Sequence, residues 1–113
     1  MQIIADAGNF TEPASEAGNH WVEHLRVADL SVGTYSVRSG GTDDQAPHAE
    51  DEIYVVTAGQ ARLIAGGESV QVGPGSVVYV AAGEVHQFTD VTADLAAVVL
   101  FAPAEGSRGT GPG

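Results

Sequence analysis

Hydrophobic and polar residues alternate over short stretches along most of the chain, and glycine or proline separates these stretches. Alternation with a period of two places the hydrophobic side chains on one face of a β-strand. The strongest stretches are rich in β-branched and aromatic residues, which favours strands. We predict strands at Trp21–Val27, Leu30–Arg38, Glu52–Thr57, Gln60–Ala65, Ser69–Val72, Ser76–Val80, Val85–Thr89 and Leu95–Phe101. Two alternatives stay open near the N-terminus, a further strand at Gln2–Ala5 and a short helix at the start of Thr11–Val27.

The glycines between these stretches predict tight turns. Gly66 and Gly67 lie between two alternating segments, and paired glycines are typical of a two-residue hairpin because both positions need a positive φ. Strands are also expected to end at Ala58-Gly59, at Gly73–Gly75 and at Ala82-Gly83. Short strands with a turn about every 8–12 residues predict an all-β, antiparallel sandwich or barrel.

Length and charge limit the classes of function. The 113 residues are enough for one domain with its own core. We expect this domain at residues 1–102, because residues 103–113 (PAEGSRGTGPG) have almost nothing to bury and predict a flexible tail. Fifteen acidic and four basic side chains give a net charge of −11. So acidic a surface repels phosphate groups and anionic lipid, which argues against nucleic-acid or membrane partners.

Cysteine and targeting signals are absent from the sequence. Without cysteine, any metal would have to be held by imidazole nitrogen and by oxygen. The N-terminus lacks the basic and then apolar regions of a secretory signal, and no apolar run approaches the ~20 residues of a membrane span. We therefore expect a cytoplasmic protein.

Two segments carry the candidate chemistry. His48, Glu50, Glu52 and Tyr54 alternate in the first, so they share one face of a regular strand. Inside a barrel, an imidazole or a carboxylate would cost several kcal/mol to desolvate unless it bound a partner or a metal. His86 in the second segment has the same parity as an apolar neighbour, which also indicates an inward position. His48, Glu52 and His86 would together form a facial triad with open coordination positions.

These segments resemble the two motifs of the cupin superfamily, G-x5-H-x-H-x3,4-E-x6-G and G-x5-P-x-G-x2-H-x3-N. Glu52 stands six residues before Gly59, which puts His48 at the second histidine of the first motif. Gly75, Gly83 and His86 match the second motif. The resemblance covers residues 30 to 102, and it implies a cupin jelly-roll β-barrel of the small, single-domain bacterial kind.

The resemblance also implies a divalent metal (Fe, Mn, Ni or Zn) and a small-molecule substrate, with dioxygenase, isomerase, epimerase or lyase chemistry. The chain departs from the motifs at Ala46, which replaces the first histidine, and at Ala81 and Asp90, which replace the proline and the asparagine. Gln45 or Glu50 could replace the missing ligand, or three ligands could suffice. A non-catalytic ligand-binding or sensor cupin with a degraded metal site is the alternative function.

Other residues receive roles around this centre. Glu50, if it does not bind metal, is a candidate general base. Tyr54, Arg26 and Gln45 are candidate substrate-binding residues, Arg26 because a guanidinium matches a carboxylate. An open jelly roll has sheet edges to cover, so we also expect a homodimer.

Overall fold

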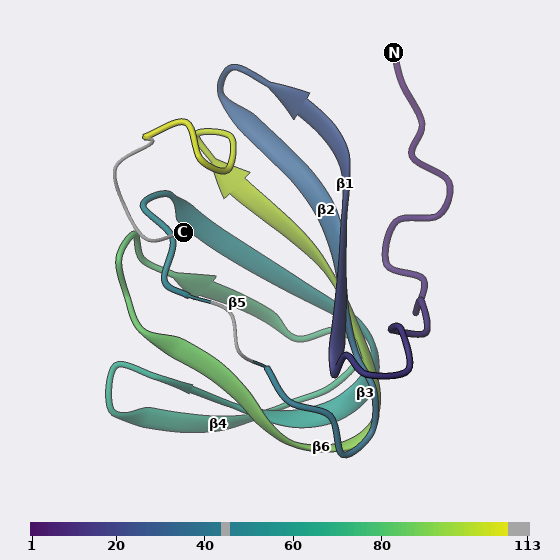
Figure 1. The fold of residues 1–113 in the computed structure, drawn as a ribbon. Helices are drawn as coiled ribbons and strands as arrows, with labels where there is room; N and C mark the ends of the chain where they lie inside the picture. Colours follow the sequence, from purple (N-terminus) through teal and green to yellow (C-terminus); the bar gives the residue numbers. More distant parts are fainter. Residues whose placement is uncertain (44–45, 109–113) are drawn as a thin grey trace.

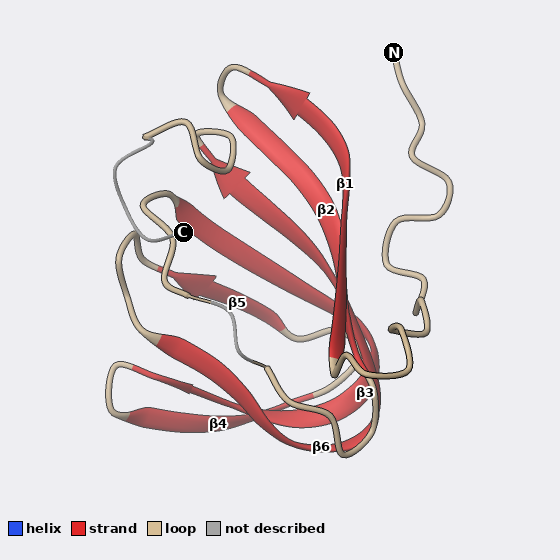
Figure 2. Ribbon diagram, in the orientation of Figure 1, coloured by secondary structure: helices blue, strands red, loops and turns tan. Residues whose placement is uncertain are grey.

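The computed structural model describes residues 1–43 and 46–108. Six strands form one antiparallel sheet, and this described part of the chain contains no helix (Figure 2), so none that could cross a membrane. The all-β, antiparallel class predicted from the sequence is confirmed. The strands are β1 (Asn19–Val27), β2 (Leu30–Val37), β3 (Asp51–Ala65), β4 (Glu68–Val72), β5 (Val77–Val80) and β6 (His86–Ala102).

The sheet has the strand order β1-β2-β6-β3-β4, and β5 pairs with β3. β3 and β6 are long enough to serve both halves of the fold, and the sheet curls over on itself in Figure 1. The second half of β6 lies between β2 and the first half of β3, whereas the first half of β6 pairs with the second half of β3. The inner face of this curled sheet holds the core.

Two predicted strand ends are bends inside continuous strands, so eight predicted stretches form six strands. Glu52–Thr57 and Gln60–Ala65 join as β3, with register shifts opposite β6 between Val56 and Arg62. Gly59 makes this bend possible, since its φ is +90° and a Cβ there would collide with the Asp94 carbonyl. Val85–Thr89 and Leu95–Phe101 likewise join as β6, apart from Val85.

The inner face carries the side chains that the alternation predicted. Glu50, Glu52, Tyr54 and Val56 are all buried, as their shared parity requires. Tyr54 packs edge-on against Phe88 with ring centroids 4.9 Å apart. The buried hydrophobic cluster also includes residues of β2, β4, β5 and β6: Tyr35, Val37, Val72, Val80, Val91, Leu95, Ala97, Val99 and Phe101. The hairpin at Gly66-Gly67 is confirmed, with φ of +58° and +79°.

The N-terminal segment forms neither the strand nor the helix considered for it. Residues 2–5 are not in a strand, and β1 begins only at Asn19. The segment instead contacts β2 through side-chain acceptors: the Gly8 amide donates to Thr34 Oγ1 (2.9 Å) and the Thr11 amide to Ser36 Oγ (3.0 Å). Such contacts satisfy backbone groups without extending the sheet.

The segment after β6 turns back onto the domain. Ala104 is buried, and the Glu105 amide donates to Ser31 Oγ at 2.9 Å. Residues 103–108, the first part of the segment expected to be a flexible tail, therefore contact the core face of the sheet. Residues 109–113 lie outside the described residues.

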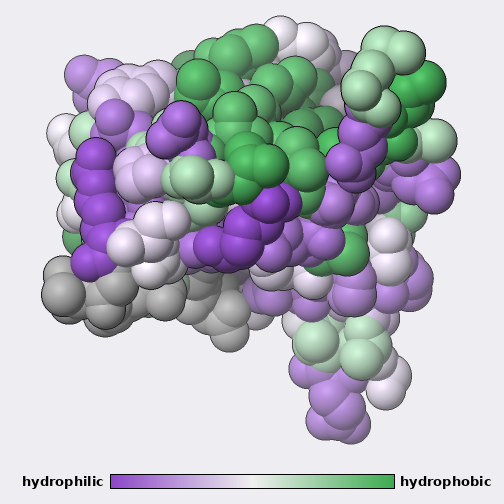
Figure 3. All heavy atoms as spheres, turned by 90° about the horizontal axis from the view of Figure 1, so that it is seen from above, coloured by the Kyte–Doolittle hydropathy of each residue, from purple (hydrophilic) through white to green (hydrophobic). Residues whose placement is uncertain are grey.

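Hydrophobic side chains also gather on the surface, as the continuous area in Figure 3 shows. Three exposed hydrophobic residues lie on paired strands outside the core: Ile53 on β3 and Val77 and Tyr79 on β5. Ile53 is opposite Tyr79 in the register, and Val55 is opposite Val77. We call these four residues the outer apolar face.

Candidate functional site

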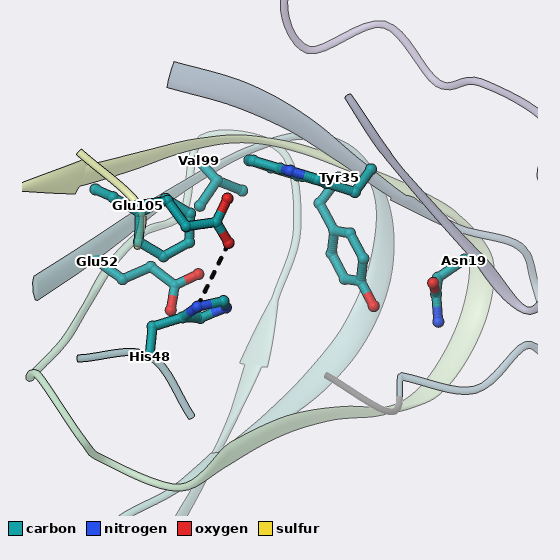
Figure 4. A pocket seen from close by; sticks show the side chains of 8 residues that line it. Asn19, Tyr35, His48, Glu52, Val99 and Glu105 are labelled. Carbon is teal, nitrogen blue, oxygen red and sulfur yellow. Dashed lines mark ion pairs between the residues drawn. The ribbon is translucent and has the colours of Figure 1, made fainter. Parts of the chain in front are cut away.

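A pocket of about 230 Å³ opens on the inner face of the sheet. Its walls come from β1, β2, β3, β6, the loop before β3 and the segment after β6. Figure 4 shows Glu52, Glu105 and His48 together at one end, and Tyr35 and Asn19 away from them. The described lining residues are Asn19, Trp21, Tyr35, His48, Glu52, Val99, Phe101 and Glu105.

Glu52 is the most unusual residue of the pocket. It lies on β3 opposite Phe101 and Val80, and only 2% of its surface is exposed. Neither carboxylate oxygen has a hydrogen-bond partner among the described residues. Buried polar groups are almost always hydrogen-bonded, and an isolated buried carboxylate costs several kcal/mol. Its ionic contact with His86 Nε2, at 3.2 Å from Oε1, compensates part of this cost, and the position leaves the carboxylate able to bind a further ligand.

His86, the first residue of β6, is the nearest ionisable neighbour of Glu52. Its Nε2 lies 3.2 Å from Glu52 Oε1 and 3.0 Å from the Tyr54 hydroxyl, and its Nδ1–H donates to the Glu84 carbonyl at 2.9 Å. The Glu84 contact therefore leaves Nε2 facing the carboxylate. Burial lowers the pKa of His86, but Glu52 and the Glu84 carbonyl outweigh it, so the pKa lies above its usual value.

His48 lies in the loop before β3 and lines the same pocket as Glu52. Its backbone carbonyl accepts a hydrogen bond from the Gly83 amide at 2.7 Å, and its ring packs edge-on against Phe101. Its Nδ1 lies 3.4 Å from Glu105 Oε2, the contact drawn in Figure 4. The protein thus brings two of the three expected ligands, Glu52 and His86, into contact, whereas His48 pairs with a different carboxylate.

The described residues contain no group of three His, Asp or Glu side chains already arranged to hold a metal. The donor chemistry nevertheless fits a divalent cation. Glu52 offers two buried oxygens without hydrogen bonds, and the Nδ1 contact of His48 leaves its Nε2 as the remaining ring donor. Nε2 of His86 faces Glu52 and also contacts the Tyr54 hydroxyl. Such an Nδ1 contact to a carboxylate or carbonyl is typical of histidines that bind metals.

Glu105 is a pocket residue that the sequence analysis missed. It lies in a stretch rich in glycine and proline that predicts no element, and no motif points to it. Burial raises the pKa of its carboxyl, and repulsion from Glu23 and Glu52 adds to this, while His48 and Arg26 oppose it. Its position depends on the way the segment after β6 is held.

Glu50 holds that segment and does not line the pocket. It is 2% exposed, and its two oxygens accept hydrogen bonds from the backbone amides of Gly106 (2.9 Å) and Arg108 (3.2 Å). Glu50 was expected to be a candidate general base, but both of its carboxylate oxygens already accept hydrogen bonds. The alternation correctly placed the residue inside, and its contacts indicate an anchoring role.

Tyr54 and Arg26, two of the residues predicted to bind substrate, are not among the described residues that line the pocket. Tyr54 is fully buried in the hydrophobic core, and its hydroxyl contacts His86 Nε2. Arg26 is exposed, and its guanidinium makes two hydrogen bonds to Glu23 (2.7 and 3.2 Å), as in an ordinary surface ion pair. Ala46 is exposed. Gln45 lies outside the described residues.

Comparisons with known proteins agree with this architecture. A family model described as a cupin domain matches residues 33–103. An uncharacterized protein of Streptomyces coelicolor, SCO3923, is 46% identical over 85 residues, which are 75% of this chain and 81% of that protein.

Two solved structures share the fold at low sequence identity. KdgF from Halomonas has a TM-score of 0.71 and 21% identity, over 80% of this chain and 84% of that one. An uncharacterized protein with a double-stranded β-helix domain from Klebsiella pneumoniae has a TM-score of 0.77 and 17% identity, over 91% of each chain. The jelly-roll architecture expected from the two motifs is thus confirmed.

Proposed function

The chain belongs to the cupin family, and we propose that it is a metal-dependent enzyme that acts on a small organic molecule in the pocket beside Glu52. The observation that carries this proposal is the buried carboxylate of Glu52, whose two oxygens have no hydrogen-bond partner among the described residues. A divalent cation would neutralise this charge and use both oxygens. Metal binding would then compensate the free energy that the protein loses by burying this carboxylate.

Glu52, His86 and His48 would hold the cation, the same residues that the sequence motifs indicate. Iron, manganese, nickel or zinc are the candidates, because the donors are imidazole nitrogen and carboxylate oxygen. The chemistry supplied by such an ion when bound is polarisation of a substrate oxygen or, with iron(II), activation of dioxygen.

The chain's own groups would bind and orient the substrate. Trp21, Phe101 and Val99 line the pocket with apolar surface that excludes water. Glu105 accepts a contact from His48 Nδ1 and would keep that ring in one orientation. Tyr54 contacts His86 from the core side and limits its movement.

The test is elemental analysis of protein purified without chelator. We expect close to one divalent ion per chain, and a large loss of metal in His86→Ala and in Glu52→Gln. His24→Ala is the matched control, because His24 contacts Thr34 on β2 and does not line the pocket. Equal metal content in the His86 and His24 variants would contradict the proposal.

The alternative is a non-catalytic cupin that binds a small ligand, and one observation favours it. The contact with Glu105 occupies Nδ1 of His48 and one carboxylate of the pocket. In addition, Ala46 stands at the position of the first motif histidine. Ligand binding without turnover by metal-loaded protein would favour this alternative over the enzyme.

We also propose that two chains associate through the outer apolar face. Ile53 is 37% exposed and Val77 66% exposed, although hydrophobic residues of this size are normally covered when they lie side by side. Light scattering after size exclusion should give a dimer for the natural chain and a monomer for Ile53→Glu. Val70→Glu, at an exposed residue of β4, is the control and should remain a dimer.

A further inference from the structure

The pocket holds one carboxylate, Glu105, beyond the Glu52 carboxylate that is proposed to bind the metal. Among its described lining residues, Glu52 and Glu105 are carboxylates and His48 is the basic residue. Arg26, whose charge acts on the Glu105 carboxyl, makes two hydrogen bonds to Glu23. The part of a ligand beside Glu105 would therefore meet a carboxylate without an available guanidinium, which favours a positively charged group at that end of the pocket.

The aromatic side chains of Trp21 and Phe101 also line the pocket. Trp21 and Phe101 pack edge to face with ring centroids 6.0 Å apart, and Phe101 also contacts the ring of His48. Gly33 on β2 makes this arrangement possible, because a Cβ at that position would collide with the Trp21 indole. Aromatic faces attract organic cations, most strongly when the cation has lost its water.

We propose that the ligand of this pocket is a small organic cation that also bears an oxygen group. Its ammonium group lies between Trp21, Phe101 and Glu105, and its oxygen points toward Glu52 and His86. This inference rests on the proposed function, because the oxygen end is the end that meets the metal. The combination of the Glu105 carboxylate with aromatic lining in about 230 Å³ selects positive charge and small size together.

Trp21 is the single tryptophan of the chain, so its fluorescence reports on the pocket directly. The probes are choline and 3,3-dimethylbutan-1-ol, which have the same shape and the same hydroxyl but differ in charge. We expect choline to bind at least about tenfold more tightly than the neutral alcohol, as a desolvated cation on aromatic rings beside a carboxylate should. Equal affinities for the two probes would overturn the inference.

Glu105→Gln separates charge from shape. It should weaken choline binding by about tenfold and leave the neutral alcohol unchanged, because the amide keeps the size of the carboxyl and removes its charge. Glu68→Gln is the control, since Glu68 is an exposed residue of β4 outside the described lining of this pocket. A Glu105 variant that folds and binds choline as tightly as the natural chain would count against the inference.

The same titrations, carried out on chelator-treated and zinc-loaded protein, separate this inference from the proposed function. Zinc binding without a preference for choline would refute the organic cation and leave the metal centre standing. A preference for choline in protein that binds no zinc would support the organic cation and refute the metal centre.

Discussion

Glu50 and Glu52 allow a matched test, because the two carboxylates are equally buried and two residues apart but differ in their contacts. Each is 2% exposed. Both oxygens of Glu50 accept hydrogen bonds from backbone amides, whereas neither oxygen of Glu52 has such a bond among the described residues. Replacing each glutamate with glutamine changes the charge at nearly constant volume. The free energy of unfolding of the metal-free protein should respond in opposite directions.

For Glu50→Gln we expect a loss of about 1.5–3 kcal/mol, because one charge-assisted bond is lost and the new amide group faces a backbone N–H. For a domain of this size the melting temperature should fall by about 4 °C per kcal/mol. For Glu52→Gln we expect no loss and a gain of up to about 2 kcal/mol, since a buried carboxylate whose oxygens accept no hydrogen bond among the described residues is replaced by a neutral amide. His86 loses its ion pair in this variant but can release its proton at little cost near neutral pH.

The assay is thermal and urea unfolding of both variants and the natural chain, with chelator and again with zinc. With zinc at about 100 times its dissociation constant, the natural chain should gain about 2.7 kcal/mol, and so should Glu50→Gln above its own metal-free value. Glu52→Gln should gain little. If Glu52→Gln destabilised the metal-free protein as much as Glu50→Gln, Glu52 would have an ordinary structural role and the reasoning would fail.

Three further outcomes follow from the same contacts. Because folding raises the pKa of His86, the protonated ring stabilises the folded protein fully below about pH 6.5, and this stabilisation is lost as the pH rises through the pKa of the folded state. Urea unfolding of metal-free protein should show this decline in stability, and Glu52→Gln should make the decline smaller. Ending the chain after Pro103 removes both amide donors to Glu50, so the urea midpoint should fall by an amount equivalent to about 2–4 kcal/mol; an unchanged midpoint would contradict the anchoring role. Gly33→Ala should displace the single tryptophan into water and shift its emission to longer wavelength, whereas an unshifted emission would show that the indole does not depend on this glycine.

The sequence predicted the fold class well because alternation and glycine report on local geometry. Parity placed Glu52, Tyr54 and Val56 inside, and the structure buries all three. It divided β6, which contains no glycine, where Asp90, Thr92 and Asp94 interrupt the hydrophobic residues. It divided β3 because a glycine at a bend looks the same in the sequence as a glycine at a turn. Only the opposite strand distinguishes them: Gly59 lies against the backbone of Asp94.

The candidate site was predicted in part, for a related reason. Motif spacing indicated Glu52 and His86, which meet across β3 and the start of β6. It could not indicate Glu105, which reaches the pocket through a turn held by Glu50, a contact between residues more than 50 positions apart in the chain. Nor could it show that His48 pairs with that carboxylate, since the pairing depends on where the segment after β6 lies.

The most direct test of the metal centre is X-ray absorption at the zinc edge of zinc-loaded protein. Two histidines and one carboxylate should give a first shell of nitrogen and oxygen, with the multiple-scattering signal of two imidazole rings. His86→Ala should retain the signal of one ring. A spectrum without imidazole scattering in the natural chain, or one unchanged in His86→Ala, would contradict a metal centre built on Glu52 and His86.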